Sequence, residues 1–411
     1  MLSEKLRRNF GILDLGIIFT MLSLVAIGLI SIYSATGGHD SNFVSNNFQR
    51  QIYWFGIGMV LFLLTVTLNP KLYQALAYVI YGIIIIALLA VLVKGSSVGG
   101  AVRWLSIGGL RFQPSEWAKI ATIFALARFL TDNHDKLHDK RRLLMLAGLG
   151  LLPMLLIFKQ PDLGTALVFL VIVPSMMHWA GVSPLILFLT FMPALTMIAS
   201  FNLWTFVGVM GVLLSVLFIV KKTVLFSLAH IVLNVLVGVV TPFLWTSLEA
   251  YQQKRVLSFL GLVSDPKGIS YQVIQSKVAI GSGGITGKGF MAGTQTQLRF
   301  LPEQHTDFIF SVIGEEFGIL GCVIVIFLFV LLLSRGIQLA SNLKNRFISL
   351  VTIGVTTMFL YHYSVNLGMV MGIMPVTGLP LPFISYGGSF LVTCMIAIGI
   401  FVNFSINRHE Y

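Results

Sequence analysis

Long apolar stretches recur along almost the whole chain and restrict it to one kind of fold. Hydrophobic residues make up 56% of the 411 residues, whereas charged residues make up only 10%. This composition lies far from that of soluble globular domains. A bilayer core of about 30 Å is crossed by roughly 20 apolar residues in a helix, since backbone groups in lipid need partners within the protein. The sequence therefore predicts an all-α, polytopic membrane protein with a single domain.

About twelve stretches are predicted to cross the membrane as helices. They cover residues 12–35, 52–69, 72–93, 115–130, 143–158, 163–181, 184–200, 203–220, 224–246, 307–333, 347–370 and 384–405. Two of them, 115–130 and 143–158, are short for a complete crossing unless they are tilted, re-entrant or extended by flanking residues. The apolar run at the N-terminus is too long for a cleaved signal peptide and is interpreted as an uncleaved first span.

Most basic residues lie between the predicted spans, so the net charge of +12 is explained by membrane orientation and not by nucleic acid. By the positive-inside rule, the segments that carry these residues are cytoplasmic. They are Lys5, Arg7, Arg8, Lys71, Lys136, Arg142, Lys221, Lys222, Arg335, Lys344, Arg346 and Arg408. Both termini are then expected in the cytoplasm, and residues 247–306 form a large external loop.

Four stretches concentrate Gly, Pro and charge, and all four fall on the outer side in this topology. They are residues 94–114, 159–165, 247–306 and 367–389. Irregular backbone at membrane depth is tolerated where it is buried in protein or lines a wet cavity, so a shared outward-facing cavity is predicted. Within the long loop, Tyr271–Ile280 has the apolar spacing of a short amphipathic helix suited to the membrane surface, and the glycines of 281–289 end it.

Several ionisable residues lie in or beside predicted spans, where a charge is costly and often functional. Glu116 and Lys119 are three residues apart and share a helix face, which fits a structural ion pair or a substrate-facing role. Asp162 opens a span beside Lys159, where it fits a helix cap or a functional acid.

Two adjacent acids, Glu315 and Glu316, lie too far along their span to serve as caps, unlike Asp307 near its start. At least one of the two is expected to have a partner.

Other motifs are weaker. The stretch GSGGITGKG fails the P-loop pattern, since Gly283 is too close to Gly287 and Lys288 is followed by another glycine. His134 and His138 have a spacing that can bind metal, but they lie in a charged turn without an evident third ligand. Cys322 and Cys394 fall inside spans and are interpreted as packing residues.

Asp265 is the one central acid of the long loop, and its sequence context SDPKG is typical of a tight turn. Its location favours a second interpretation. Lys254, Arg255, Lys267 and Lys277 make the surrounding loop basic, next to the membrane and above the predicted cavity. A lone carboxylate among cations in that position indicates chemistry on an anionic lipid.

Motifs distributed over nearly the whole chain resemble those of the SEDS family (shape, elongation, division and sporulation). They are Arg103-Trp104, Gln113-Pro114-Ser115-Glu116 with Lys119, KQPDLGT from Lys159, the run from Tyr271-Gln272 through IGSGGITGKG and GTQ to LPEQHTDFIFSVIGEEFG, and NLGMVMGIMPVTGLPLPFISYGGS from Asn366. Their order along the chain makes the set far more specific than any single motif. The stretch PVTGLPLPFISYGG resembles the elongation branch of the family.

The resemblance implies a peptidoglycan glycosyltransferase that polymerises lipid II at the outer face of the inner (cytoplasmic) membrane. It also implies a class B penicillin-binding protein transpeptidase as partner, together with other elongation-complex membrane proteins. The family's essential acid lies in a DP-x-G segment shortly before a YQ pair, and Asp265 of DPKGISYQ matches it. The substrate-binding residues expected from the motifs and nearby cations are Arg103, Glu116, Lys119, Gln160, Asp162, Lys277, Glu303, His305, Asp307 and Ser385.

The chain departs from the family pattern in two places. The family has ten spans, whereas residues 183–246 provide hydrophobic sequence for two more. Because this surplus is even, the large loop stays outside. Phe390 also stands where small residues usually follow Ser389, so altered packing is expected in the last span.

Glycan polymerisation requires a base for the attacking hydroxyl and charge neutralisation for the departing pyrophosphate. We expect Asp265 to be the base, and Arg103, Lys119 and Lys277 to neutralise the leaving group, with a divalent cation such as Mg²⁺ or Mn²⁺ as an optional addition. Two rival functions are a transporter of the lipid-linked precursor and a scaffold without catalytic activity. The lack of paired repeats and the large outer loop disfavour the transporter.

Overall fold

A computed structural model describes the fold. It covers residues 15–37, 41–98, 101–107, 110–137, 139–220, 224–246, 253, 269–298 and 300–408. Two compact units are present: residues 1–176 together with 258–411, and residues 177–257.

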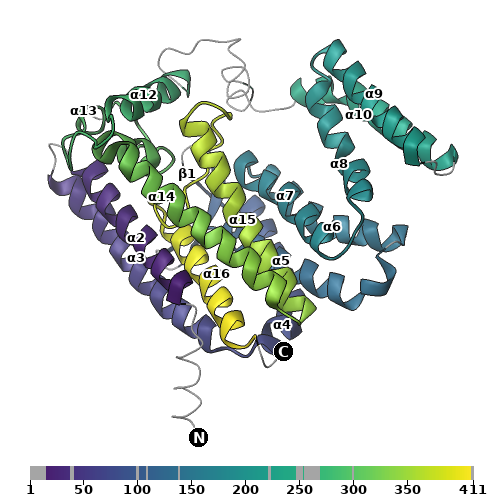
Figure 1. Ribbon diagram of the computed structural model, residues 1–411, viewed down its shortest axis with the longest axis horizontal. Helices are drawn as coiled ribbons and strands as arrows, with labels where there is room; N and C mark the ends of the chain where they lie inside the picture. The colour runs from purple at the N-terminus through teal and green to yellow at the C-terminus, as the bar shows by residue number, and fades with distance from the viewer. Residues whose placement is uncertain are drawn as a thin grey trace, which may run out of the picture. The chain divides into compact units, whose positions relative to one another are not determined.

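Twelve long helices account for most of the described residues (Figure 1). They are α2 (Leu15–Thr36), α3 (Ser41–Thr67), α4 (Pro70–Lys94), α5 (Pro114–Asp132), α6 (Lys140–Phe158), α7 (Leu163–Trp179), α8 (Pro184–Ala199), α9 (Leu203–Val220), α10 (Val224–Thr246), α14 (Ile309–Asn342), α15 (Arg346–Val370) and α16 (Gly388–Ile406). The short helices α12 (Ile269–Ser282) and α13 (Thr294–Gln297) bring the described α-helices to fourteen.

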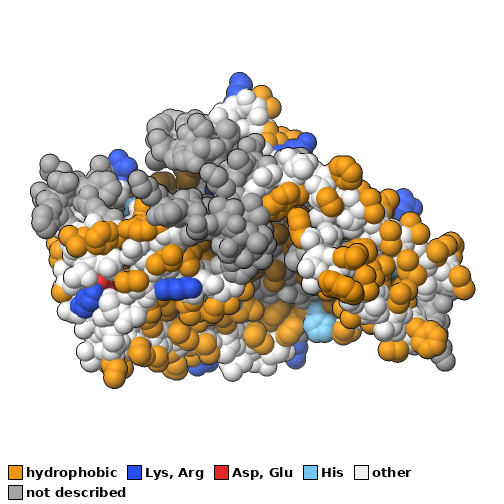
Figure 2. All heavy atoms as spheres, turned by 90° about the horizontal axis from the view of Figure 1, so that it is seen from above, with side chains coloured by type: hydrophobic (Ala, Val, Ile, Leu, Met, Phe, Trp, Pro, Cys, Tyr) orange, Lys and Arg blue, Asp and Glu red, His pale blue; other side chains and the backbone are white. Residues whose placement is uncertain are grey.

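The prediction of an all-α, polytopic membrane protein is confirmed. Within the described residues, eight helices are long and apolar enough to cross a membrane, and α7, α8 and α9 are shorter apolar helices. Each predicted span corresponds to one of the twelve long helices, with shifted ends. Figure 2 shows apolar side chains spread widely over the described part of one face, as expected for helices that face lipid.

Two helix boundaries differ from the prediction for a physical reason. Helix α3 begins at Ser41 and not near residue 52. It therefore includes the polar side chain of Gln51, which bonds to the segment before α16. The Gln51 amide accepts from the N–H of Gly387 at 3.2 Å and donates to the carbonyl of Ser385 at 3.4 Å. Helix α16 begins at Gly388 and not near residue 384, because the preceding backbone is bonded to other segments.

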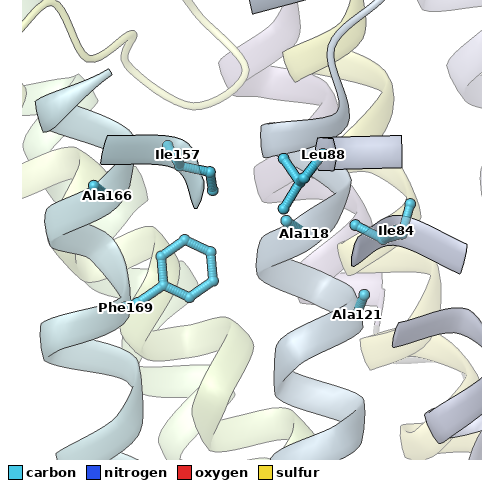
Figure 3. Close-up of a cluster of buried hydrophobic side chains, with 7 residues drawn as sticks. All are labelled: Ile84, Leu88, Ala118, Ala121, Ile157, Ala166 and Phe169. Atoms are coloured by element: carbon cyan, nitrogen blue, oxygen red, sulfur yellow. The ribbon is translucent and has the colours of Figure 1, made fainter. Parts of the chain in front are cut away.

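One buried apolar cluster of the larger unit lies where α4, α5, α6 and α7 meet. Figure 3 shows Leu88 and Ala118 on one side of this contact and Ile157 and Phe169 on the other.

The C-terminal end of α3 is bonded to a polar side chain of α16. The Asn403 amide donates to the carbonyls of Thr65, Val66 and Leu68 at 3.2, 2.8 and 2.6 Å. One side chain thus pairs carbonyls that the end of α3 leaves without helical partners.

The smaller unit consists mainly of α8, α9 and α10. Leu189, Met192, Leu213 and Leu217 form its buried apolar cluster. A polar contact joins α8 to α10, where the Thr196 hydroxyl lies 2.6 Å from the side-chain oxygen of Asn234. These helices correspond to the surplus hydrophobic sequence predicted at residues 183–246.

A small antiparallel sheet occupies most of the predicted irregular stretch 94–114. Its strands are β1 (Ser96–Val98), β2 (Ala101–Ile107) and β3 (Leu110–Phe112), in the order β1-β2-β3. The sheet was not anticipated, and it places Arg103 and Trp104 on the central strand.

Helix α14 is interrupted at Gly318, whose φ of 64° and ψ of −158° are non-helical. The glycine-rich turn at residues 283–289 pairs the backbone groups near this break. Lys288 and Gly289 donate to the carbonyls of Glu315 and Glu316 at 3.0 Å. In the other direction, the N–H groups of residues 319 and 320 donate to the carbonyls of residues 284 and 285 at 3.0 and 3.1 Å. A broken helix in a membrane protein requires such replacement partners.

Gly283 is expected to tolerate no side chain, since a Cβ at this position would lie 2.0 Å from the carbonyl oxygen of Gly314. We predict that Gly283→Ala destabilises the protein by about 3 kcal/mol or more, because backbone must shift to relieve the overlap. The matched control is Gly281→Ala two residues earlier in α12, where a Cβ meets nothing within 4 Å. Thermal unfolding in detergent measures both variants, and equal melting temperatures would contradict the close approach.

Candidate active site

The proposed catalytic acid Asp265 lies outside the described residues, as do Lys254, Arg255, Lys267 and Arg299. The predicted turn role and the predicted catalytic role of Asp265 therefore both stay predictions. The described part of the long outer loop resumes at Ile269.

Helix α12 confirms the predicted helix at residues 271–280 and extends it to 269–282. Its buried side is formed by Ser276 and Ala279, whereas Ile274 and Val278 are exposed. The Ser276 hydroxyl donates to the carbonyl of Val370 at 2.9 Å, which fixes α12 against the end of α15. The opposite face thus leaves two apolar side chains uncovered, together with Lys277, whereas the polar Ser276 is buried.

The segment at residues 371–387, which links α15 to α16, is here called the outer crossover, after the side on which the sequence predicts it. Three consecutive carbonyls of the preceding outer loop are bonded to it or to its base. The carbonyl of His305 accepts from the N–H of Tyr386 at 2.9 Å, and that of Thr306 accepts from the Ser385 hydroxyl at 2.6 Å. The carbonyl of Asp307 accepts from the Asn366 amide at 2.9 Å. Residues 305 and 307, which belong to one motif, are therefore brought together with residue 385 of another motif.

Other predicted residues also approach the outer crossover. The end of the Lys277 side chain lies directly against Gly372, where a Cβ would come within 2.6 Å of Nζ. Gly164, two residues after Asp162, packs against the crossover at Thr377, whose carbonyl oxygen would lie 2.9 Å from an added Cβ. The crossover thus connects the start of α7, helix α12 and the loop before α14.

Asp162 has the first of the two roles that the sequence left open, a helix cap, and its role as a functional acid stays a prediction. Its carboxylate accepts from the N–H of Thr165 at 3.3 Å, which is the geometry of an N-cap for α7. It also lies 3.8 Å from the guanidinium of Arg103 on β2, which in turn donates to the carbonyl of Pro161 at 2.5 Å. Gln160 is almost fully buried and donates to the carbonyl of Leu88 at 3.0 Å. Arg103 retains partial exposure, with 27% of its side chain accessible.

Glu116 and Lys119 form the ion pair that their spacing allowed, at 2.7 Å. The Lys119 side chain is 0% exposed and also lies 2.9 Å from Nε2 of His362 on α15. Its ammonium lies 5.0 Å from the centre of the Phe390 ring, a cation–π distance. Phe390 itself stacks near His362, with ring centres 4.9 Å apart. The unusual Phe390 is therefore part of a packed group that joins α5, α15 and α16.

Glu303 lies at a turn in the loop before α14. Its backbone carbonyl accepts from the N–H groups of Thr306 and Phe308, and its carboxylate accepts from the Thr306 hydroxyl at 2.9 Å. The Glu303 side chain is exposed, whereas the His305 ring lies against Tyr386 with centres 5.5 Å apart. Burial lowers the pKa of the His305 imidazole below its usual 6.5, and the nearby Glu303 carboxylate opposes this shift.

Sequence reasoning did not single out His362, Asn366 or Gln51 as individual residues. His362 is a titratable side chain inside a predicted span, and such residues deserve a functional or structural explanation. Asn366 stands at the start of a motif, but only the structure shows that it bonds two carbonyls, those of Asp307 and Leu379. Gln51 lay in a polar stretch that the hydropathy pattern excluded from its helix.

Metal binding finds no support among the described residues, where no three His, Cys, Asp or Glu side chains group around a common point. Of the two histidines whose spacing was noted, His134 lies 3.0 Å from Asp135 and His138 lies outside the described residues.

Comparison with known proteins decides the family. The chain matches the family of cell cycle proteins FtsW, RodA and SpoVE over residues 15–201 and 182–410. It belongs to this family. The peptidoglycan glycosyltransferase MrdB of Escherichia coli K12 is 37% identical over 97% of this chain and 94% of its own length. The peptidoglycan glycosyltransferase RodA of Treponema pallidum is 36% identical, over 98% and 99% respectively.

Solved structures are similar to this chain in fold over nearly its whole length. The rod shape determining protein RodA of Thermus thermophilus is similar with a TM-score of 0.63 and 28% identity, over 97% of this chain and 98% of that one. A chain from a peptidoglycan synthase complex, described for its coordination of polymerization and crosslinking, gives a TM-score of 0.73 and 32% identity over 97% and 99%. The predicted family is thereby confirmed.

His305 is expected to make stability pH-dependent. Because its pKa is lowered in the folded protein, its stabilising contribution is complete above the usual pKa of 6.5 and is lost as the pH falls through the lowered pKa. We predict that the melting temperature in detergent falls between neutral and mildly acidic pH, and that His305→Gln falls less over the same range. If the melting temperature of His305→Gln fell with acid as much as that of the unmodified chain, His305 would not be the source of the decrease.

Lys119 and Glu116 are expected to depend on each other. Lys119→Met leaves a carboxylate buried without its cation, so we predict a loss of about 3–5 kcal/mol in the free energy of unfolding. Adding Glu116→Gln to Lys119→Met should recover part of that loss. Asp132→Asn is the matched control, since it removes the acid of the exposed pair with Arg128, where less than about 1 kcal/mol is expected. A double variant as unstable as the sum of the single ones would contradict the coupling.

Proposed function

We propose that this chain polymerises lipid II into glycan strands, with Asp265 as the general base. Peptidoglycan glycosyl transfer of the RodA and MrdB type, acting in cell elongation, is the activity of the chain, in agreement with the function that the sequence predicted. The convergence of predicted residues on the outer crossover is the observation that carries the proposed location of the site. Lys277, His305 and Asp307 come from one run of motifs and contact this segment or its base, and Ser385, which comes from a second motif, lies within the segment and bonds back to the loop of the first.

The reaction joins two lipid-linked units. A sugar hydroxyl of the acceptor attacks the anomeric carbon of the donor, and the bond from that carbon to the pyrophosphate oxygen breaks. The pyrophosphate leaves with the bonding electrons, while the hydroxyl proton passes to the carboxylate of Asp265. A single direct displacement inverts the configuration at the anomeric carbon, by analogy with inverting sugar chemistry.

The leaving pyrophosphate needs cations, and two of the three expected ones are accessible. Arg103 is partly exposed and Lys277 is exposed, so both can contact a substrate at the outer crossover. Lys119 is enclosed by Glu116, His362 and Phe390. In this proposal Lys119 and Glu116 therefore hold three helices together, and Arg103 and Lys277 neutralise the leaving group.

Twelve membrane spans and an external catalytic loop complete the proposal. Each of the twelve long helices crosses the membrane, both termini are cytoplasmic and the loop at 247–306 is periplasmic or external. The many Lys and Arg residues between helices on the other side support this orientation. The proposed partner is a class B penicillin-binding protein transpeptidase within the elongation complex, in line with the related chain that belongs to a peptidoglycan synthase complex.

Asp265→Asn is the decisive variant, because it removes the base and keeps the size of the side chain. We expect the rate of polymer formation from labelled lipid II to fall at least about 100-fold, the usual contribution of general base catalysis. Asp135→Asn, an exposed acid in the turn after α5, is the matched control. The assay uses the purified full chain with a class B transpeptidase.

Three outcomes would count against the proposal. Full activity of Asp265→Asn would exclude Asp265 as the base. Movement of lipid II across vesicle membranes without polymer would favour a transporter. Neither polymer nor transport by the unmodified chain with its partner would favour a scaffold.

A further inference from the structure

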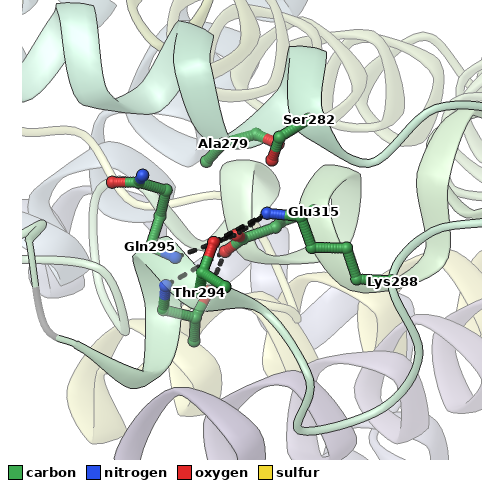
Figure 4. A network of polar contacts seen from close by, with 7 residues as sticks. Ala279, Ser282, Lys288, Thr294, Gln295 and Glu315 are labelled. Atoms are coloured by element: carbon green, nitrogen blue, oxygen red, sulfur yellow. Dashed lines mark hydrogen bonds and ion pairs between the residues drawn. The ribbon is translucent and has the colours of Figure 1, made fainter.

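Glu315 of α14 is the centre of a dense polar network on the outer side of the larger unit (Figure 4). Its side chain is 0% exposed. One carboxylate oxygen accepts from Nζ of Lys288 at 2.8 Å, from the N–H of Gln295 at 2.9 Å and from the Thr294 hydroxyl at 3.2 Å. The other accepts from the N–H and hydroxyl of Thr296 at 3.0 and 2.8 Å. The buried charge is thus fully partnered, as a stable buried acid requires.

The network caps a short helix from outside its own sequence. The N–H groups of Gln295 and Thr296 belong to the first turn of α13, where backbone donors have no helical partner. The residue before α13 is Gly293, which has no side chain to cap them. Glu315 takes that role, and a Cβ on Gly293 would lie only 2.7 Å from its carboxylate.

From α13 the contacts continue to the outer crossover. The carbonyl of Thr296 accepts from the Gln304 amide at 3.1 Å, and the same amide donates to the carbonyl of Ala35 on α2 at 2.7 Å. Gln304 is followed directly by His305, whose carbonyl is bonded to the N–H of Tyr386. An unbroken series of contacts therefore runs from Glu315 through α13 to the loop that pairs with the crossover.

We propose that Glu315 is a positioning residue for glycan polymerisation. It fixes α13, and through Gln304 it sets the position of the loop that carries His305 and Asp307 against the outer crossover. This inference rests on the proposed function, because it names a residue that holds the proposed site in position. Lys288, from the glycine-rich stretch that fails the P-loop pattern, neutralises the carboxylate and ties the turn at 283–289 to the same network.

Loss of Glu315 should displace the loop without unfolding the bundle. The network holds a four-residue helix and a turn, whereas α14 has separate contacts with α2 and α15. Glu315→Gln keeps the shape of the side chain, but it removes the negative charge opposite Lys288 and turns an N–H₂ group toward backbone donors. A small displacement of groups that hold reactants lowers turnover strongly.

The test measures polymerisation kinetics with labelled lipid II, using the full chain with a class B transpeptidase. We expect Glu315→Gln to lower kcat about tenfold or more and to leave KM within about threefold. Lys288→Met should show a smaller decrease in kcat, and Lys288→Arg should restore most of it. Lys344→Met, an exposed lysine between α14 and α15, is the control.

Hydrogen exchange of the same proteins separates positioning from general destabilisation. We expect faster exchange of the Gln295 and Thr296 amides in Glu315→Gln and Lys288→Met, with unchanged protection in α15 and α16. Unchanged kcat in Glu315→Gln would overturn the inference, and so would a loss of protection throughout the bundle. A chain that makes no polymer before any substitution would instead overturn the proposed function.

Discussion

The need to pair every backbone polar group near the membrane organises the end of the protein where we propose the active site. Regular helices satisfy their own backbone, but the outer crossover and the loop before α14 do not. They solve this by bonding to each other and to polar side chains from the bundle, such as Asn366 and Gln51. The irregular segments of the proposed catalytic site are therefore held in place by the same hydrogen bonds that satisfy their backbone groups.

Buried charges follow the same rule at two depths of the larger unit. Glu315 is surrounded by donors from the outer loop, and Lys119 is enclosed by partners from three helices. Such groups contribute less to net stability than their contacts suggest, because their desolvation is costly. Their effect is to specify which segments lie together. Glu315 holds the loop residues 288 and 294–296 against α14, and Lys119 holds α5 against α15 and α16.

The sequence predicted the helical architecture well because long apolar stretches, separated by short polar ones, run along almost the whole chain. Each long helix was anticipated, and errors were confined to ends such as Ser41, where polar side chains continue a helix into protein contacts. The sheet around Arg103 was missed, since its short strands carry no clear alternation. Family motifs pointed to His305, Asp307 and Ser385, but no pattern indicated that consecutive carbonyls would join them. That arrangement depends on contacts between residues far apart in the chain.

Four hydrogen bonds between main-chain atoms pair the glycine-rich turn with the broken helix α14, in addition to the side-chain contact of Lys288 with Glu315. Side chains at Ile285 and Thr286 take no part in the four hydrogen bonds, so evolution is free to exchange them, whereas Gly283, Gly287 and Gly318 admit no Cβ. We therefore expect residues 285 and 286 to vary among relatives and the three glycines to be conserved. The position of the turn against α14 thus depends on residues that have no side chain, because only they let the two backbones come this close.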